Sequence, residues 1–177
     1  NEDLYGPYAE CLSKCDLVDE GKRTAYGYDA KMCALNRVGT IATNFRFEDK
    51  SGRVRRLHDV KADFTVLFFS NPGCEACMTI INALKESPRI SELISAGKLA
   101  VLNIYIDEDL EAWRSYMPIY PEEWFNGFDP DFVIRTDVLY NVRAIPSLYL
   151  LDKDKTVIMK DAVTERVLDF VNRFVVL

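Results

Sequence analysis

Glycine, proline, histidine and basic residues are all scarce in this sequence. Eight glycines and seven prolines in 177 residues exclude a collagen-like or low-complexity chain. No apolar run is long enough to cross a membrane as a helix. Basic residues are outnumbered, with 22 Lys and Arg against 28 Asp and Glu and a formal net charge of −6. We therefore expect neither a membrane span nor a nucleic-acid partner, because nucleic-acid binding needs a basic surface.

What the chain does contain is enough apolar material for a core. Hydrophobic residues make up 49% of the 177 residues, a length that suits one domain or one domain with an appendage. The first seven residues have neither the positive start nor the apolar stretch of a signal peptide, and no initiator methionine precedes them. This beginning fits a mature or trimmed chain.

The pattern of the sequence changes near residue 43. Residues 1–43 are helical in character and predict two helices, over 7–18 and 22–37. Residues 44–177 alternate strand and helix signals, which predicts an α/β layered domain. We therefore expect an N-terminal helical segment followed by one α/β domain.

Within the α/β part, apolar runs and turn residues predict most of the elements. The run from Phe64 to Ser70 is nearly unbroken, which is typical of a central strand that is covered on both faces. The predicted elements are a hairpin over 45–57, strands over 64–70 and 99–106, helices over 74–87 and 110–117, an ordered aromatic insert over 118–134, a helix over 136–142, a hairpin over 147–159 and a last helix over 163–174.

The feature that points to chemistry is Cys74-Glu75-Ala76-Cys77, at the passage from a buried strand to a helix. Unpaired amides and the helix dipole at a helix N-terminus stabilise a thiolate on Cys74. Cys77 lies one turn later on the same face, so the two sulfurs can approach. The expected chemistry is thiol–disulfide exchange, in which Cys74 attacks and Cys77 resolves the mixed disulfide.

A structural disulfide or half of a metal site would explain the same C-x-x-C. A zinc site needs two further ligands, and the candidates are His58, the only histidine, and three N-terminal cysteines without a second C-x-x-C. The βαβ context favours a redox motif, and we predict no metal and no cofactor besides the disulfide of Cys74 and Cys77.

A second element is Ile145-Pro146, directly before the predicted strand that begins at Ser147. A proline at a strand start is tolerated because it need not donate to the sheet. Taken alone it would be an ordinary trans proline. Its place in the order strand, C-x-x-C, helix, strand, helix, Ile-Pro, hairpin, helix argues against an ordinary trans proline.

With these motifs the sequence resembles the thioredoxin-like superfamily over roughly residues 38–177. Besides the C-x-x-C and the Ile-Pro, the resemblance rests on the segments 38–45, 105–113 and 140–146. It is most similar to the extracytoplasmic branch related to the TlpA and ResA disulfide reductases, and more narrowly to Bacteroidetes-type thioredoxin-like proteins with an N-terminal domain of unknown function.

The resemblance implies a thioredoxin-like fold, with a central mixed β-sheet flanked by helices. It implies a thiol–disulfide oxidoreductase, more a reductase than an oxidase, that acts on protein disulfides outside the cytoplasm, in a bacterial periplasm, with an unidentified electron donor. Cys74 becomes the exposed nucleophile and Cys77 the buried resolving thiol. Ile145-Pro146 becomes a cis peptide, and its neighbouring backbone pairs with an extended substrate.

Two departures from the family pattern concern the site. Gly73 stands where the family usually has tryptophan, which should leave the Cys74 sulfur more open. The positions that match a buried carboxylate beneath the resolving cysteine are Phe68 and Ile80, both apolar. Glu75 is the nearest carboxylate in sequence and is expected to be an exposed acid of the first helical turn. Asp107 is a weaker candidate for the proton acceptor.

The remaining signals leave alternatives open. Cys33 could form a structural disulfide with Cys11 or Cys15 if the two N-terminal helices pack antiparallel, or all three could be small buried residues. The rings of the insert could cover the sheet edge, which we favour, or bind partner proteins. They are Tyr120, Trp124, Phe125 and Phe128.

Two other functions compete with the oxidoreductase. A thiol peroxidase needs a threonine near its cysteine, and none stands among Ser70 to Gly73. A redox-inactive protein-binding module could use the N-terminal helices or the aromatic insert to recruit a partner.

Overall fold

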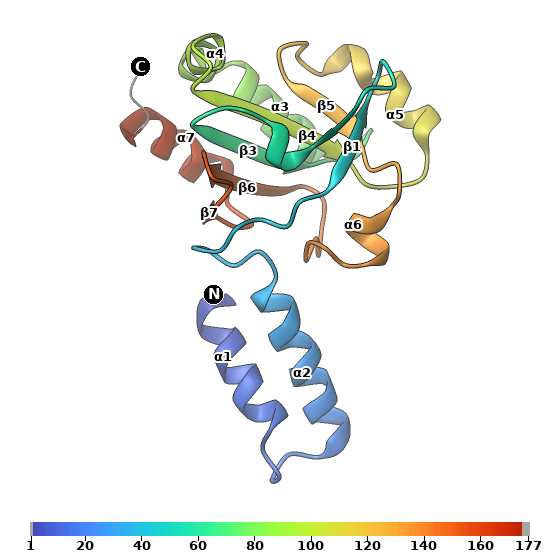
Figure 1. Ribbon diagram of the computed structural model, residues 1–177, viewed down its shortest axis with the longest axis vertical. Helices are drawn as coiled ribbons and strands as arrows, with labels where there is room; N and C mark the ends of the chain where they lie inside the picture. The colour runs from blue at the N-terminus through green and yellow to red at the C-terminus, as the bar shows by residue number, and fades with distance from the viewer. Residues whose placement is uncertain (1, 175–177) are drawn as a thin grey trace.

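A computed structural model describes residues 2–174 and shows an α/β body with a helical hairpin projecting from it (Figure 1). The body is built on a mixed sheet in the order β2-β1-β5-β4-β3-β6-β7. β3, β4 and β5 are parallel, and β6, β7, β1 and β2 join by antiparallel pairing. The strands are β1 (Arg46–Asp49), β2 (Val54–Arg56), β3 (Phe64–Phe69), β4 (Leu99–Tyr105), β5 (Phe125–Phe128), β6 (Ser147–Asp152) and β7 (Val157–Met159).

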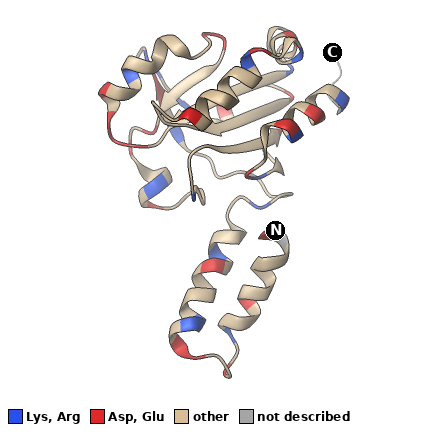
Figure 2. Ribbon diagram, turned by 180° about the vertical axis from the view of Figure 1, so that it is seen from behind, with Lys and Arg blue, Asp and Glu red and all other residues tan. Residues whose placement is uncertain are grey.

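Helices cover the sheet because its central strands are apolar on both faces. In β3 successive side chains alternate between two cores, with Val66 and Phe68 in one and Leu67 and Phe69 in the other. The first core is shared with helices α3, α4 and α7, which lie in front of the sheet in Figure 2. The helices of the body are α3 (Glu75–Lys85), α4 (Pro88–Ser95), α5 (Leu110–Tyr116), α6 (Val133–Thr136) and α7 (Thr164–Phe174), with short 3-10 turns at Leu57–Asp59 and Met117–Ile119.

The N-terminal segment forms two antiparallel helices, α1 (Glu2–Ser13) and α2 (Glu20–Ala34). Within its bounds α1 carries acidic residues and no Lys or Arg, whereas α2 carries both acidic and basic residues (Figure 2). The base of the hairpin is tied to the body by Glu2, whose carboxylate pairs with Lys160 at 2.6 Å and with Arg143 at 3.0 Å. Lys160 also donates to the carbonyl of Leu35 at 2.7 Å.

Several predicted boundaries were wrong for reasons of capping and backbone conformation. α1 ends at Ser13 rather than residue 18, and α2 begins after the N-cap Asp19, which accepts from the Lys22 amide. Pro88 does end the preceding helical segment, and it also opens α4, since Ser87 caps the new helix and proline is tolerated in its first turn.

The largest errors concern residues 118–142. The insert that was expected to cover the sheet edge supplies β5, an interior strand between β1 and β4. Its rings are largely core residues, with Tyr120, Trp124 and Phe128 no more than 7% exposed. The helix expected over 136–142 lies earlier and is shorter, because Val138 adopts a positive φ of 50° that no helix continues through.

Candidate redox site

Cys74 lies at the start of α3, directly after the loop that leaves β3. It is the N-cap residue, and its Sγ accepts a hydrogen bond from the Cys77 amide at 3.2 Å. Cys74 is half-buried and Cys77 is only 1% exposed. An accessible sulfur therefore faces the unpaired amides of a helix N-terminus, and a second thiol lies covered one turn later.

The two thiols differ in how easily they ionise. Burial raises the pKa of Cys77 to about 12, and the adjacent Cys74 sulfur adds to the effect. A backbone hydrogen bond from Asn71 acts in the opposite direction but is weaker. Cys77 is therefore a protonated thiol near neutral pH in this structure, in which both cysteines are free thiols.

Gly73 is the residue that replaces the family's tryptophan, and its backbone explains the glycine. Its φ is +72°, a left-handed conformation that strains residues with a side chain. A Cβ at this position would lie 3.4 Å from the hydroxyl oxygen of Tyr116. The ring of Tyr116 thus stands close to the turn before Cys74.

The Ile145–Pro146 peptide bond is cis, and sheet register brings it to the cysteine loop. Ser147, the first residue of β6, pairs with Phe69, the last residue of β3. A groove of about 450 Å³ runs beside Pro146 and is bordered by Ala76 and Thr79 of α3. The helix that carries the predicted nucleophile and the predicted cis-proline therefore lie at the same end of the strand pair β3 and β6.

The two carboxylates weighed as proton acceptors lie in different surroundings. Glu75 is exposed on α3. Asp107 accepts a hydrogen bond from the Asn71 side chain and pairs with Arg135, so it supports the loop before Cys74. Neither carboxylate is among the causes that set the pKa of Cys77.

The sequence analysis missed a buried polar cluster that lies on the Cys77 side of the sheet. Ser70 donates to the Asn103 side-chain oxygen at 2.5 Å, and Asn103 donates to Asn126 at 3.2 Å. Burial raises the pKa of Tyr120, and the Ser70 and Asn103 side chains act in the opposite direction. Ser70, Asn103 and Tyr120 are 1%, 1% and 4% exposed. Asn103 within an otherwise apolar strand was the available signal.

The N-terminal cysteines are free thiols in this structure, which does not form the bridge from Cys33 to Cys11 or Cys15 that the sequence left open. Helix register gives the reason. Cys33 packs opposite Gly6. A Cβ added at Gly6 would lie 3.0 Å from the Cβ of Cys33. Since α-helices rise about 1.5 Å per residue, Cys11 lies about 7 Å further along α1 and Cys15 further still, beyond disulfide reach.

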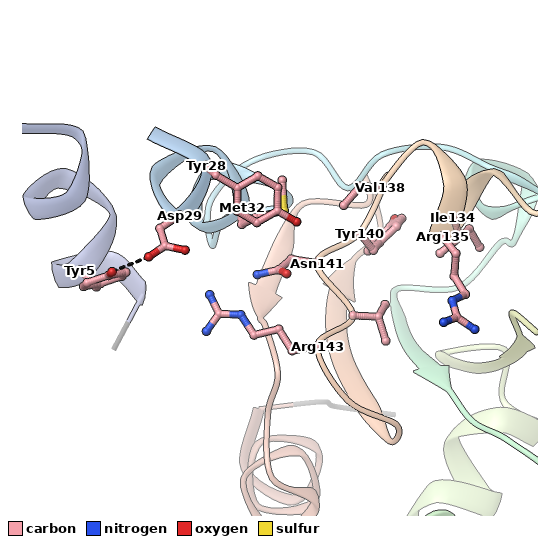
Figure 3. Close-up of a pocket in the computed structure, with 11 residues that line it drawn as sticks. Tyr5, Tyr28, Asp29, Met32, Ile134, Arg135, Val138, Tyr140, Asn141 and Arg143 are labelled. Atoms are coloured by element: carbon pink, nitrogen blue, oxygen red, sulfur yellow. Dashed lines mark hydrogen bonds between the residues drawn. The ribbon is translucent and has the colours of Figure 1, made fainter. Parts of the chain in front are cut away.

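A pocket of about 590 Å³ separates the helical hairpin from the loop before Pro146 (Figure 3). Tyr5 and Asp29, which share a 2.5 Å hydrogen bond, line the hairpin side. Asn141 and Arg143 line the loop side and point toward the hairpin (Figure 3). Neither cysteine of the C-x-x-C lines this pocket, so it is separate from the thiol pair.

In residues 2–174 no group of three or more His, Cys, Asp or Glu side chains is placed to hold a metal ion. The Nε2 of His58 instead lies 2.8 Å from the carbonyl oxygen of Ala42. None of the described helices has the length and apolarity that a membrane crossing requires.

Solved structures share this architecture, which is the thioredoxin-like fold. A thioredoxin-like protein from Bacteroides caccae is 40% identical, with a TM-score of 0.95 over 98% of this chain and 63% of that chain. The C-terminal domain of an uncharacterized Bacteroides fragilis protein is 46% identical, with a TM-score of 0.76 over 79% of this chain and 100% of that one.

A more distant neighbour is the thioredoxin domain of a thiol-disulfide oxidoreductase from Bacteroides vulgatus, 19% identical, with a TM-score of 0.67 over 78% of this chain and 98% of that one. At this identity the likeness shows the fold alone. No family model and no curated protein sequence matches the chain. The chain belongs to the thioredoxin-like family, and it spans 63% of the length of the Bacteroides caccae protein.

Proposed function

We propose that this chain is a thiol–disulfide oxidoreductase that reduces protein disulfides with Cys74 and Cys77. The observation that carries the proposal is the contrast between the two thiols. Cys74 is reachable and receives a hydrogen bond at the start of α3, whereas Cys77 is buried and protonated one turn later. An attacking sulfur must be accessible, and a resolving sulfur must be withheld until the mixed disulfide has formed.

The reaction balances as an exchange of two disulfides. The Cys74 thiolate attacks one sulfur of a substrate disulfide, forms a mixed disulfide and releases the other sulfur as a thiolate, which takes up a proton. Cys77 then gives up its proton to solvent and attacks the Cys74 sulfur, the bond from Cys74 to the substrate sulfur breaks, and the released substrate thiolate takes up a proton. The products are a substrate dithiol and a disulfide between Cys74 and Cys77, which an external dithiol donor must reduce again.

The groove beside Pro146 is the proposed place for the substrate backbone. An extended segment there would pair with the backbone next to Ile145 and present its disulfide to Cys74. Gly73, with no side chain, leaves the approach to the Cys74 sulfur open. The family resemblance supports an extracytoplasmic location, in a bacterial periplasm, and a separate electron donor.

Reduction of insulin disulfides by dithiothreitol tests the proposal. The protein should accelerate the turbidity that follows release of the insulin B chain, and Cys74→Ser should abolish the acceleration. Cys77→Ser should instead accumulate a mixed disulfide between Cys74 and the substrate, because nothing resolves it. Cys15→Ser, in the helical hairpin, is the matched control and should keep full activity.

The result that contradicts the proposal is equally clear. Turnover by the native chain that equals dithiothreitol alone, with no change in Cys74→Ser, would leave a redox-inactive member of the fold.

A further inference from the structure

The groove beside Pro146 is lined by two segments of different chemistry. From α3 it receives Ala76, Thr79 and Ile80, which are uncharged. From the chain over 161–165, which leads out of β7 into α7, it receives the carboxylates of Asp161 and Glu165. None of the described residues that line the groove is a Lys or an Arg. A segment bound there therefore meets uncharged surface and negative charge together.

The two carboxylates are available to a bound segment. Both residues are exposed, and in residues 2–174 neither forms an ion pair with a Lys or an Arg. Asp161 accepts a hydrogen bond from the Ser147 hydroxyl at 2.6 Å, which holds its carboxylate beside the first residue of β6. Because Ser147 directly follows Pro146, one negative charge is fixed next to the cis-proline.

Basic side chains also occur near Asp161, but they border a second cavity of about 690 Å³ that Asp161 shares with the groove. Two of them are already paired, since Glu2 lies 3.0 Å from Arg143 and 2.6 Å from Lys160. The start of α7 adds about half a unit of positive charge, which is less than the two full charges of the groove. The basic residues of the second cavity are Arg37, Arg143, Lys160 and Arg166.

We propose that the groove selects protein disulfides that have a lysine or an arginine close to the reacting cysteine. The cation of the bound segment lies near Asp161 and Glu165, and an apolar neighbour contacts Val163, which is 58% exposed. Complementary charge of this kind sets which partner is preferred and adds no step to the disulfide exchange. This inference rests on the proposed function, whose substrate class it names.

Three peptide disulfides test the selection. Each is a symmetrical dimer of a short peptide in which the cysteine is flanked on both sides by lysine, by glutamine or by glutamate. Cys11 and Cys15 are not buried, so the parent protein for the experiment carries serine at both positions. The reduced protein is mixed with each peptide, and the release of peptide thiol is followed. Every rate is divided by the rate with dithiothreitol, an uncharged reductant, which removes differences in the intrinsic reactivity of the peptides.

The parent protein should reduce the lysine peptide about fivefold faster than the glutamate peptide, because one exposed ion pair changes an equilibrium by up to about that factor. The glutamine peptide should fall between them. Raising the ionic strength to about 1 M, where the screening length is about 3 Å, should remove most of the difference.

Asp161→Asn and Glu165→Gln remove the charges with little change of shape. Asparagine can still accept from Ser147, and it tolerates the positive φ of 45° at position 161. Each substitution should lower the preference for lysine over glutamate about twofold, and both together should abolish it. The glutamine peptide should react at the parent's rate throughout, which a folding defect would not allow.

Asp169→Asn is the matched control. It removes one exposed carboxylate from the same helix, where Asp169 pairs with Arg173 at 2.7 Å and does not line the groove. The preference should stay as in the parent protein. An equal loss of preference in Asp169→Asn would assign the effect to the net charge of the chain and overturn the inference.

The other outcomes are distinct from one another. Equal normalised rates for the three peptides in the parent protein would overturn the inference and leave the proposed function standing. A preference that survives in the double variant would also overturn it, because the selection would then lie elsewhere. Reduction of no peptide by the parent protein would remove the proposed function, and this inference with it.

Discussion

Gly127 offers a sharp test of how β5 is built into the sheet. A Cβ added at this residue would lie 2.8 Å from Cδ2 of Phe47 and 2.9 Å from the carbonyl oxygen of Glu48. Carbon atoms prefer about 3.5–4.0 Å, so the methyl group of Gly127→Ala would overlap a buried ring and the β1 backbone. The neighbouring strand must therefore shift.

The expected cost follows from two opposing effects. Overpacking of a well-filled core costs about 1–3 kcal/mol, and replacing glycine with alanine returns about 0.5–1 kcal/mol through the unfolded chain. We expect Gly127→Ala to lower the free energy of unfolding by about 1–2 kcal/mol. For a chain of this size the Tm should fall by about 2–8 °C.

Urea and thermal unfolding measure the change, and a second substitution identifies its cause. In a Phe47→Leu background the clash with the ring is relieved, so the alanine should cost less there than in the native chain. Gly27→Ala, in α2, is the comparison and should raise the free energy of unfolding. A Cβ at Gly27 would meet nothing nearer than the Cβ of Ser13 at 3.7 Å, and alanine is the better helix former. A Gly127→Ala protein as stable as the native chain would refute the reasoning.

Three further outcomes are expected elsewhere in the chain. Burial lowers the pKa of Lys155 below its usual 10.5, so the unfolded chain binds more protons and stability from this site rises as pH climbs toward that value. Lys155→Met should flatten this rise of stability as pH approaches 10.5 in urea titrations, and an unchanged slope counts against it. Lys160→Met removes the pairing with Glu2 and the bond to the end of α2, so hydrogen exchange of the amides over 36–43 should accelerate, and unaltered protection would disprove the tether. After oxidation, denaturation and alkylation, peptide mapping should find Cys33 as a free thiol, whereas a cross-linked Cys33 peptide would contradict the helix register.

The strands that the sequence revealed are those buried on both faces. β3, β4 and β6 were predicted almost to the residue because such burial leaves continuous apolar runs in the sequence. β5 carries Asn126 and Gly127 and lies between prolines, so its local pattern is that of a loop, and only pairing with β1 and β4 makes it a strand. Tertiary contacts overrode local preference there.

The site divides in the same way. The C-x-x-C and the Ile-Pro were visible as motifs, since each depends on a few adjacent residues. The polar cluster joins Ser70, Asn103 and Asn126, which are far apart in the chain and meet only when strands pair. The pairing of Cys33 stayed open for the same reason, because spacing along a helix does not give the register between two helices.

The core around Cys77 has a consequence for how the chain is made. Leu148 and Leu150 of β6 and Val171 of α7 belong to the same buried core as this thiol, and all three lie about 70 or more residues after it in the chain. During synthesis those residues emerge well after Cys77. Until they arrive, Cys77 lacks the shelter that keeps it inert, so a nascent or truncated chain exposes it to stray oxidation. A chaperone or a reductant should therefore protect Cys77 from oxidation until the core around it is complete.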